Sequence, residues 1–382
     1  MEDFLNIEGL PRRLRKYVAS MIKKMKRGKM IHLEHVKGKI IASVDGVETH
    51  RRSMSLEKFK EYVAAGLLDR HSQIAVHKDK SGVVESLDVY HRLVVICIIT
   101  DRGPMPLSWG YQESDSNEKY AEWLSRGGLE SEMPNQTETV SDKLKQEGEI
   151  TTLKRLLAGL KTNFPRKMPF DVLIGDGLYD KAPVLCEVEK YGVALIAVHK
   201  GEHRDLRKEA VEDFSTCKPL RQWTENHKEY EGWMKVFEDK NIQRCSKKIR
   251  IVRVTRRSKN DLVDNYFYCS DKTWITPRLV EWCRYYRWKQ ENGFNAWANT
   301  WKLLKHVFHH THNACDAMLG LIFISIIMVE NFRHGNLRRG KTKKKLSLKL
   351  FFRELVKGIK LKTREDLEEL CGYSGSEILV VT

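Results

Sequence analysis

Two aspartates in this sequence stand in the same local setting. Asp45 closes the apolar run Gly38–Gly46 (GKIIASVDG), Asp176 closes the run FDVLIGD, and a glycine follows each of them. An apolar run that ends in Asp-Gly is typical of a buried strand and its turn. Ligand crevices of open α/β sheets lie at the carboxyl ends of the strands. Because Asp-Gly after a strand is also a common turn, the pair is a hypothesis for a carboxylate site at one edge of a sheet.

A third acid, Glu291, lies in a Trp- and Arg-rich segment that is predicted to be helical. Carboxylate oxygens are the ligands that Mg²⁺ prefers. Two such ions, about 3.5–4 Å apart, activate the nucleophile and neutralise the scissile phosphate in phosphodiester chemistry. If the fold brings the three acids together, they predict this two-metal chemistry, with Mn²⁺ as a possible substitute. Taken alone, Glu291 would be a solvated helix charge.

The elements that must position these acids are clearest around Asp176. Strand Phe170–Asp180, helix Ala182–Gly192 and strand Val193–Lys200 follow one another with short connections. Such a βαβ unit implies two parallel strands. Two further strands, Ser86–Thr100 and Pro104–Gln112, are joined by an Asp-Arg-Gly-Pro turn and are predicted to form a hairpin.

Two segments differ from this α/β pattern. Residues 113–150 are polar and acidic, which predicts a loop before a helix at Thr151–Phe164. Residues 201–275 carry short alternating runs such as Ile249–Arg257, which predict a β-rich insertion. After Pro277 the pattern becomes helical again.

The composition predicts a basic globular protein. The net charge is +17, and hydrophobic residues make up 41% of the chain. Such a positive field favours nucleic acid as the partner, with an anionic membrane surface as the alternative. The longest apolar run, Ala317–Val329, is shorter than the roughly 20 residues that span a bilayer, and it predicts a buried helix instead. Eight scattered cysteines without a CxxC pair argue against a zinc finger or a disulfide framework, and the expected compartment is the cytoplasm.

Several of these segments resemble the insertion-sequence DDE transposases, in particular the insertion-sequence-4-like branch. Val172–Lys200 resembles their second-aspartate motif, in which Asp-x-x-Tyr ends a strand, and Asp176 and Tyr179 match it. Lys37–Arg52 is similar to the first-aspartate strand, and Arg284–Trp297 is similar to the Tyr-Arg-Glu signature around the third acid.

The resemblance implies an α/β, RNase H-like mixed sheet with flanking helices, interrupted by a β-rich insertion. It implies that Asp45, Asp176 and Glu291 are the catalytic residues and bind two Mg²⁺ ions. The implied reaction is hydrolysis at transposon ends, followed by attack of the freed 3′-OH on target DNA. The implied partners are double-stranded DNA and at least one further copy of the chain, in the cytoplasm at the nucleoid, with no membrane involved.

The expected organisation has five parts. A basic helical arm (1–37) precedes the first part of the catalytic domain (38–200). These are followed by the β-rich insertion (201–276), the last helices of the catalytic domain (277–335) and a basic tail (336–382). The basic helix in 1–37 contacts DNA or simply packs with a solvated basic face, and the sequence leaves both open.

Three residues near the acids are candidate DNA contacts. Arg287, four residues before Glu291, is either a phosphate clamp or the partner of Glu291 in an i,i+4 salt bridge. Tyr179 either binds a phosphate or packs its ring over the βαβ unit. Lys200 either faces DNA or is a solvent-facing strand end.

The signature departs from the family pattern at two positions. Arg284 stands where a tyrosine is expected, and Ala298 stands where a lysine is expected. Lys302 and Lys305, one and two turns further on, are candidates to bind the phosphate in its place. Two other functions stay open: a nuclease on the same fold that does not transpose, and a catalytically dead DNA-binding protein derived from a transposase.

Overall fold

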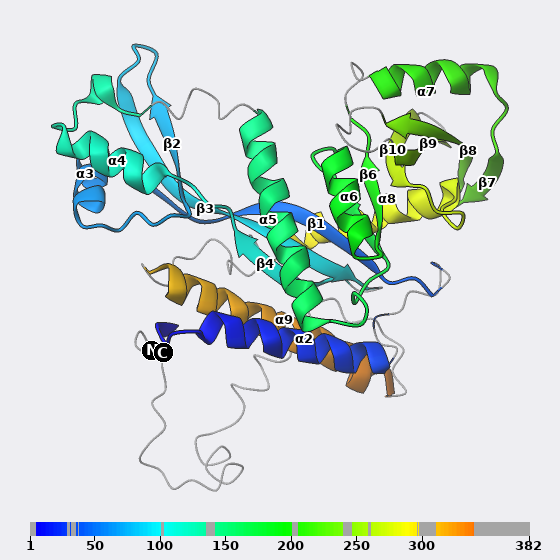
Figure 1. Cartoon of the computed structure of the whole chain (residues 1–382), viewed down its shortest axis with the longest axis horizontal. Coiled ribbons are helices and arrows are strands. Elements are labelled where there is room, and N and C mark those ends of the chain that lie inside the picture. Colours follow the sequence, from blue (N-terminus) through cyan, green and yellow to red (C-terminus); the bar gives the residue numbers. More distant parts are fainter. Residues whose placement is uncertain are drawn as a thin grey trace, which may run out of the picture. The chain divides into compact units, whose positions relative to one another are not determined.

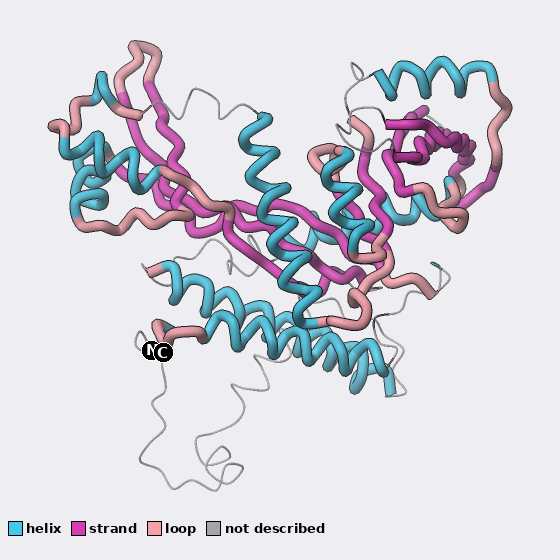
Figure 2. Tube along the Cα trace, viewed as in Figure 1, coloured by secondary structure: helices cyan, strands magenta, loops and turns pink. Residues whose placement is uncertain are grey.

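The computed structural model describes residues 5–28, 31, 36, 38–100, 103–134, 142–200, 205–239, 247–258, 261–295, 297 and 311–339 (Figures 1 and 2). By its contacts the chain divides into Met1–Asn331 and Phe332–Thr382, and the whole β-sheet belongs to the first unit. Lys302, Lys305, Ala298 and nearly all of the basic tail lie outside the described residues.

One ten-stranded sheet runs through the first unit in the order β2-β3-β1-β5-β6-β10-β9-β8-β7, and β4 pairs with β3 off this path. Its strands are β1 (Ile41–Met54), β2 (Ser72–Lys78), β3 (Val84–Ile99), β4 (Pro104–Tyr111), β5 (Val172–Gly175), β6 (Ala194–Val198), β7 (Arg221–Glu225), β8 (Lys228–Asp239), β9 (Lys247–Ser258) and β10 (Asp261–Ser270).

The helices pack on this sheet by apolar faces. They are α2 (Leu10–Arg27), α3 (Leu56–Ala64), α4 (Ser116–Ser125), the 3₁₀ turn η2 (Glu130–Glu132), α5 (Asp142–Asn163), α6 (Ala182–Lys190), α7 (Asp205–Thr216), α8 (Pro277–Asn295) and α9 (His312–Arg339). In α5, for example, Leu153, Leu157 and Leu160 recur at helical spacing and are all buried.

The strands β4, β3, β1, β5 and β6 form the RNase H-like part of the sheet. β1 pairs with β3 in antiparallel fashion and with β5 in parallel fashion, and β5 pairs in parallel with β6. The predicted βαβ unit and the β3–β4 hairpin are therefore confirmed. The fold is α/β with a mixed sheet and flanking helices. β10 joins the outer edge of β6, so the β-rich segment continues the same sheet.

Helices cover both faces of the sheet. Gly46 on β1 and Gly110 on β4 lie under α5, because a Cβ at either position would contact an α5 side chain. Strand alternation sends Asp45 to the opposite face. On that face the adjacent alternate residue, Ser43, donates a hydrogen bond to Gln290 of α8. In Figure 1, α5 and α6 lie on one side of the strands, and α2 and α9 lie on the other.

Within α9, the window His312–Val329 has a mean hydropathy of 1.7, and by length and composition it could cross a membrane. However, 56% of this window is buried inside the protein. Asp316 accepts two hydrogen bonds of 2.8 Å from Arg15 of α2 and a third from the indole of Trp109. α9 is the buried helix that the apolar run predicted, and it forms part of the core.

Three expectations for the elements were wrong in detail. β1 does not end at Asp45 but continues to Met54, because its residues from Ala42 to Thr49 and from Arg52 to Met54 pair with β3, with a register shift between the two stretches. Residues 113–150 are not one loop, since α4 and the first turns of α5 lie there. The segment after residue 200 carries the helix α7 in addition to its strands.

Candidate active site

The pairing of β1 with β5 places Asp45 and Asp176 at matching positions. Ser43 pairs with Ile174 in the last step of the parallel ladder, and each aspartate lies two residues beyond its member of that pair. β5 ends at Gly175, whereas β1 continues. The two carboxylates therefore lie where the two strands part, as expected of a ligand site in a mixed α/β sheet.

The charge of one carboxylate affects the other. Burial, and next the charge of Asp176, raise the pKa of Asp45 to about 7, while Arg287 and the hydrogen bond from the Gly46 amide act in the opposite direction. The Gly46 amide donates to Asp45 Oδ1 over 2.9 Å, and the Leu178 amide donates to Asp176 Oδ1 over 2.8 Å. Backbone amides that follow the two aspartates thus orient both carboxylates. Like charges held together in this way favour a bound proton or cation.

Helix α8 brings Arg287 and Glu291 to the same place. Arg287 Nη1 lies 3.9 Å from Asp45 Oδ2, and its Nη2 lies 3.6 Å from Glu291 Oε2. The guanidinium therefore lies between the first and third acids. Glu291 is half exposed, whereas the side chain of Asp45 is only 25% exposed.

Gln290, which was not among the residues expected from the sequence, attaches α8 to the sheet. It is fully buried, accepts a hydrogen bond from Ser43 and donates to the Val95 carbonyl over 3.1 Å. At Gly293 a Cβ would lie 2.3 Å from Pro104, so only glycine lets the helix approach the start of β4 this closely. These contacts determine where Glu291 lies relative to β1.

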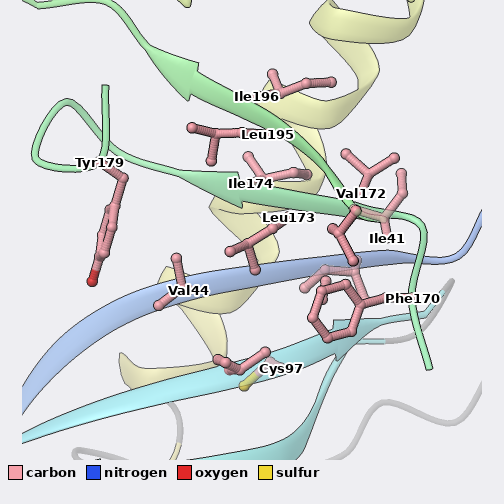
Figure 3. Close-up of a cluster of buried hydrophobic side chains, with 14 of the residues drawn as sticks. Ile41, Val44, Cys97, Phe170, Val172, Leu173, Ile174, Tyr179, Leu195 and Ile196 are labelled. Carbon is pink, nitrogen blue, oxygen red and sulfur yellow. The ribbon is translucent and has the colours of Figure 1, made fainter. Parts of the chain in front are cut away.

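The other candidates near the acids are placed as follows. Tyr179 is fully buried, and its hydroxyl donates to Glu149 Oε2 over 3.2 Å. In Figure 3 its ring extends from the turn after β5 toward β1. Lys200 is exposed, and its aliphatic stem lies over Gly177, the residue after Asp176. Arg284, at the tyrosine position of the signature, is paired with Glu281 over 2.6 Å.

Glu149 is a fourth acid, which was not expected from the sequence. It belongs to α5, is 7% exposed and lies against Gly46. A signal was present, because Glu149 lies four residues before Leu153 on the apolar stripe of the helix. Because residues 113–150 were predicted to be a loop, the predicted helix began at Thr151, too late in the chain to include Glu149.

The donor chemistry of this site suits a hard divalent cation. Asp45, Asp176 and Glu291 offer only oxygen ligands, as Mg²⁺ prefers, and a cation would relieve the repulsion from Asp176 that adds to burial in raising the pKa of Asp45. Within the described residues, no three His, Cys, Asp or Glu side chains already stand close enough to hold a metal ion as a group. The two aspartates could therefore supply only part of a ligand set, and the guanidinium of Arg287 lies between Asp45 and Glu291.

Comparison with known proteins identifies the family of the chain. A family model described as a transposase DDE domain matches residues 139–328, which include Glu149, Asp176 and Glu291. A search of curated proteins finds no match to the chain. With its RNase H-like sheet, its two facing aspartates and this domain, the chain belongs to the DDE transposases.

Proposed function

We propose that this transposase hydrolyses phosphodiester bonds at the ends of its mobile element with Mg²⁺ and then joins the freed 3′-OH to target DNA. The observation that carries the proposal is the pair of aspartates that each lie two residues beyond the last pair of the β1–β5 ladder, where burial and the charge of Asp176 raise the pKa of Asp45. Asp176 lies within the residues that match the transposase DDE domain. The resemblance of the motifs to the insertion-sequence-4-like branch supports the same reaction.

In this proposal Asp45, Asp176 and Glu291 are the catalytic residues and hold the cations. Two bound Mg²⁺ ions would supply an activated nucleophile and stabilise the leaving oxygen. The amides of Gly46 and Leu178 keep the two aspartates oriented. Gln290 keeps the helix of Glu291 on the sheet.

Arg287 and Lys200 are the proposed phosphate contacts near the acids. Arg287 lies 3.6–3.9 Å from two carboxylates, longer than a charge-assisted hydrogen bond. The guanidinium is therefore not tightly bound to either acid and is available to a phosphate once cations neutralise them. Lys200 extends over the turn that carries Asp176, where its ammonium would meet the DNA backbone.

Helix α2 is the proposed second contact with DNA. One side of it, with Val18, Ile22 and Met25, is buried. The other side is exposed and basic, and the helix contains no acidic residue; its exposed cations are Arg12, Arg13, Lys16, Lys23, Lys24 and Arg27. Such a face binds the phosphate backbone in a salt-dependent, sequence-independent way. We further propose that at least two copies act together in the cytoplasm, since two element ends must be joined.

The test is a transposition reaction with a donor plasmid that carries the gene with its flanking DNA, a supercoiled target plasmid and Mg²⁺. We expect wild-type protein to cut the donor and join its ends to the target. Asp176→Asn should lose both steps and keep DNA binding within about twofold, because a carboxylate and an amide have the same shape.

Glu113→Gln is the matched control, because Glu113 is an exposed acid paired with Arg155 of α5. It should behave as wild type. Cleavage by Asp176→Asn would remove this residue from the catalytic set. Cutting without joining would instead identify a nuclease on this fold, and binding without cutting would identify a DNA-binding derivative.

A further inference from the structure

Glu149 is a buried acid with no role in the proposed reaction. Its helix, α5, packs on the sheet through apolar neighbours such as Ile150 and Leu153. A buried carboxylate is costly unless its oxygens are used. Each of its two oxygens contacts a different one of the two segments that carry the proposed catalytic aspartates.

The first contact is with β1. A Cβ at Gly46 would lie 2.8 Å from Glu149 Oε1 and 3.1 Å from its Cδ, so only glycine admits the carboxylate at this point. The amide of the same glycine donates to Asp45 Oδ1. Glu149 therefore lies against the backbone group that orients Asp45.

The second contact is with the turn after β5. Tyr179 donates its hydroxyl hydrogen to Glu149 Oε2 over 3.2 Å. The amide of Tyr179 donates to the Asp176 carbonyl over 3.1 Å, and its ring packs against Gly175 so closely that a Cβ there would lie 2.8 Å from ring atom Cδ2. Figure 3 shows the tyrosine crossing from this turn toward β1. Glu149 and Tyr179 thus connect the Asp176 turn to the Asp45 strand.

The side from which Glu149 approaches determines what it can do. Gly46 faces α5, and strand alternation turns Asp45 toward α8, where Arg287 and Glu291 lie. Glu149 is therefore on the other face of β1 from the groups that surround the Asp45 carboxylate. Its two oxygens are directed at Gly46 and Tyr179. This arrangement is that of a supporting residue, not of a direct ligand.

We propose that Glu149 is a positioning residue of the catalytic centre, which holds the Asp45 strand and the Asp176 turn at a constant separation and adds negative charge beneath the pair. The inference rests on the proposed function, in which Asp45 and Asp176 bind a divalent cation. Groups that orient metal ligands typically change metal affinity by about 10–100-fold when they are replaced.

The experiment measures Mn²⁺ binding by electron paramagnetic resonance with the full-length chain and no DNA. Glu149→Gln keeps the shape and an oxygen for Tyr179 but removes the charge; we expect Mn²⁺ affinity to fall at least about tenfold. Tyr179→Phe keeps the charge but removes the hydrogen bond; we expect a fall of about fivefold, the equivalent of one hydrogen bond. Glu113→Gln should bind Mn²⁺ as wild type does.

Asp176→Asn separates failure of this inference from failure of the proposed function. If Asp176→Asn loses Mn²⁺ and Glu149→Gln binds it as tightly as wild type, Glu149 has no positioning role although the cation site is real. If Asp176→Asn binds Mn²⁺ as wild type does, the cation site itself is refuted. Should Glu149→Gln fail to fold, Tyr179→Phe decides: wild-type affinity in that variant overturns the inference, and reduced affinity in a folded variant supports it.

Discussion

Strand β1 contributes to two polar clusters, one made mainly of carboxylates and the other mainly of histidines. Around Asp45, several carboxylates lie close together, and the guanidinium of Arg287 lies between the carboxylates of Asp45 and Glu291. Five residues further along the same strand, His50 belongs to a cluster of histidines around one acid, Asp69. We call the first the acidic cluster (Asp45, Glu149, Asp176, Arg287, Glu291) and the second the histidine cluster (His50, Asp69, His71, His91, Tyr111, His312).

In the histidine cluster several polar groups have partners, whereas the buried His91 Nδ1 has no hydrogen-bond partner among the described residues. His91 lies 3.2 Å from Asp69 Oδ1, and His50 Nε2 lies 3.3 Å from the Tyr111 hydroxyl. The rings of His71 and His312 stack with their centroids 4.0 Å apart. These contacts connect β1, β3, β4 and the turn before β2 to the beginning of α9, so the cluster joins a helix from near the end of the described chain to the sheet.

The two clusters shift pKa values in ways that have opposite consequences. In the acidic cluster, burial and the charge of Asp176 raise the pKa of Asp45 to about 7. In the histidine cluster, burial and the charge of His71 lower the pKa of His312 to about 4. Burial opposes ionisation of Asp69 as well, but hydrogen bonding to His91 and its charge lower the pKa of that acid. His312 is therefore neutral at pH 7, whereas in the acidic cluster two carboxylates lie close together and a bound cation would relieve their repulsion.

The largest effects are expected when one residue of each cluster is replaced on β1 itself. Asp45→Asn should reduce cleavage at least about 1000-fold, because a proposed metal ligand is lost. At pH 8 it should not lower the free energy of unfolding, because it also relieves repulsion from Asp176. Plasmid cleavage and urea denaturation measure the two effects.

The matched change in the histidine cluster is His50→Asn. His50 has a φ of +55°, a conformation that asparagine tolerates. We expect this variant to lose about 1–3 kcal/mol of unfolding free energy and to cleave at the wild-type rate per folded molecule. If His50→Asn abolished cleavage in a folded protein, the histidine cluster would belong to the reaction.

A smaller effect is expected from Arg287→Gln. The guanidinium lowers the pKa of Asp45, so its loss should raise that pKa further and remove a phosphate contact. Cleavage at pH 7 should fall about 100-fold, and the rising limb of the pH–rate profile should move to higher pH. Arg284→Gln is the control, because Arg284 pairs with Glu281 away from the acids. An unmoved pH profile in Arg287→Gln would contradict the role assigned to this charge.

The cation should stabilise the protein more at high pH. The pKa of Asp45 is raised to about 7 in the folded chain, above the value of about 3.9 in the unfolded chain. Its contribution to stability is therefore fully present below about pH 4 and is lost as the pH rises through about 7. A bound cation should replace the lost proton.

We therefore expect Mg²⁺ to raise the thermal midpoint by roughly 2–4 °C more at pH 8 than at pH 5, the equivalent of about 1 kcal/mol. Differential scanning fluorimetry checks it, with Asp45→Asn as the variant that should lose the difference. Equal shifts at both pH values would separate cation binding from Asp45.

The smallest effect is expected from His312→Asn, and it has the opposite sign in pH. The unfolded chain protonates this histidine near pH 6.5, whereas the folded chain does so near pH 4. The unfolded state therefore takes up the proton first, and stability falls as the pH drops from about 6.5 toward 4. His312→Asn should flatten this acid limb and change stability at pH 8 by less than about 1 kcal/mol. Urea denaturation at pH 5 and pH 8 measures it, and an acid limb as steep as that of wild type would exclude His312 as its source.

Much of the RNase H-like core could be predicted from the sequence, because its signals are local. The unit from β5 to β6 is short, and its strands and helix follow one another within 30 residues, so apolar periodicity alone indicates it. The β3–β4 hairpin has its own turn signal. β1 was predicted too short, since its second half alternates less clearly and is held by pairing with β3.

The acids could be identified from the sequence only one by one. Their apolar runs and motif positions indicated Asp45, Asp176 and Glu291. Glu149 was missed because a loop was predicted for residues 113–150, and Gln290 was missed because nothing local distinguishes it from an ordinary polar residue of a helix. The histidine cluster could not be predicted either, since His50, His71, His91 and His312 are far apart in the chain.

The order of strands and helices, the basic charge and the candidate acids could be predicted without a structure, because they depend on neighbouring residues. Which side chains meet depends on the packing of the folded chain. Parallel pairing of β1 with β5 sets Asp45 opposite Asp176, and the packing of α5 and α8 on opposite faces brings Glu149 and Glu291 to the same strand. Register and packing are set by contacts between residues distant in the chain, and no local pattern encodes them.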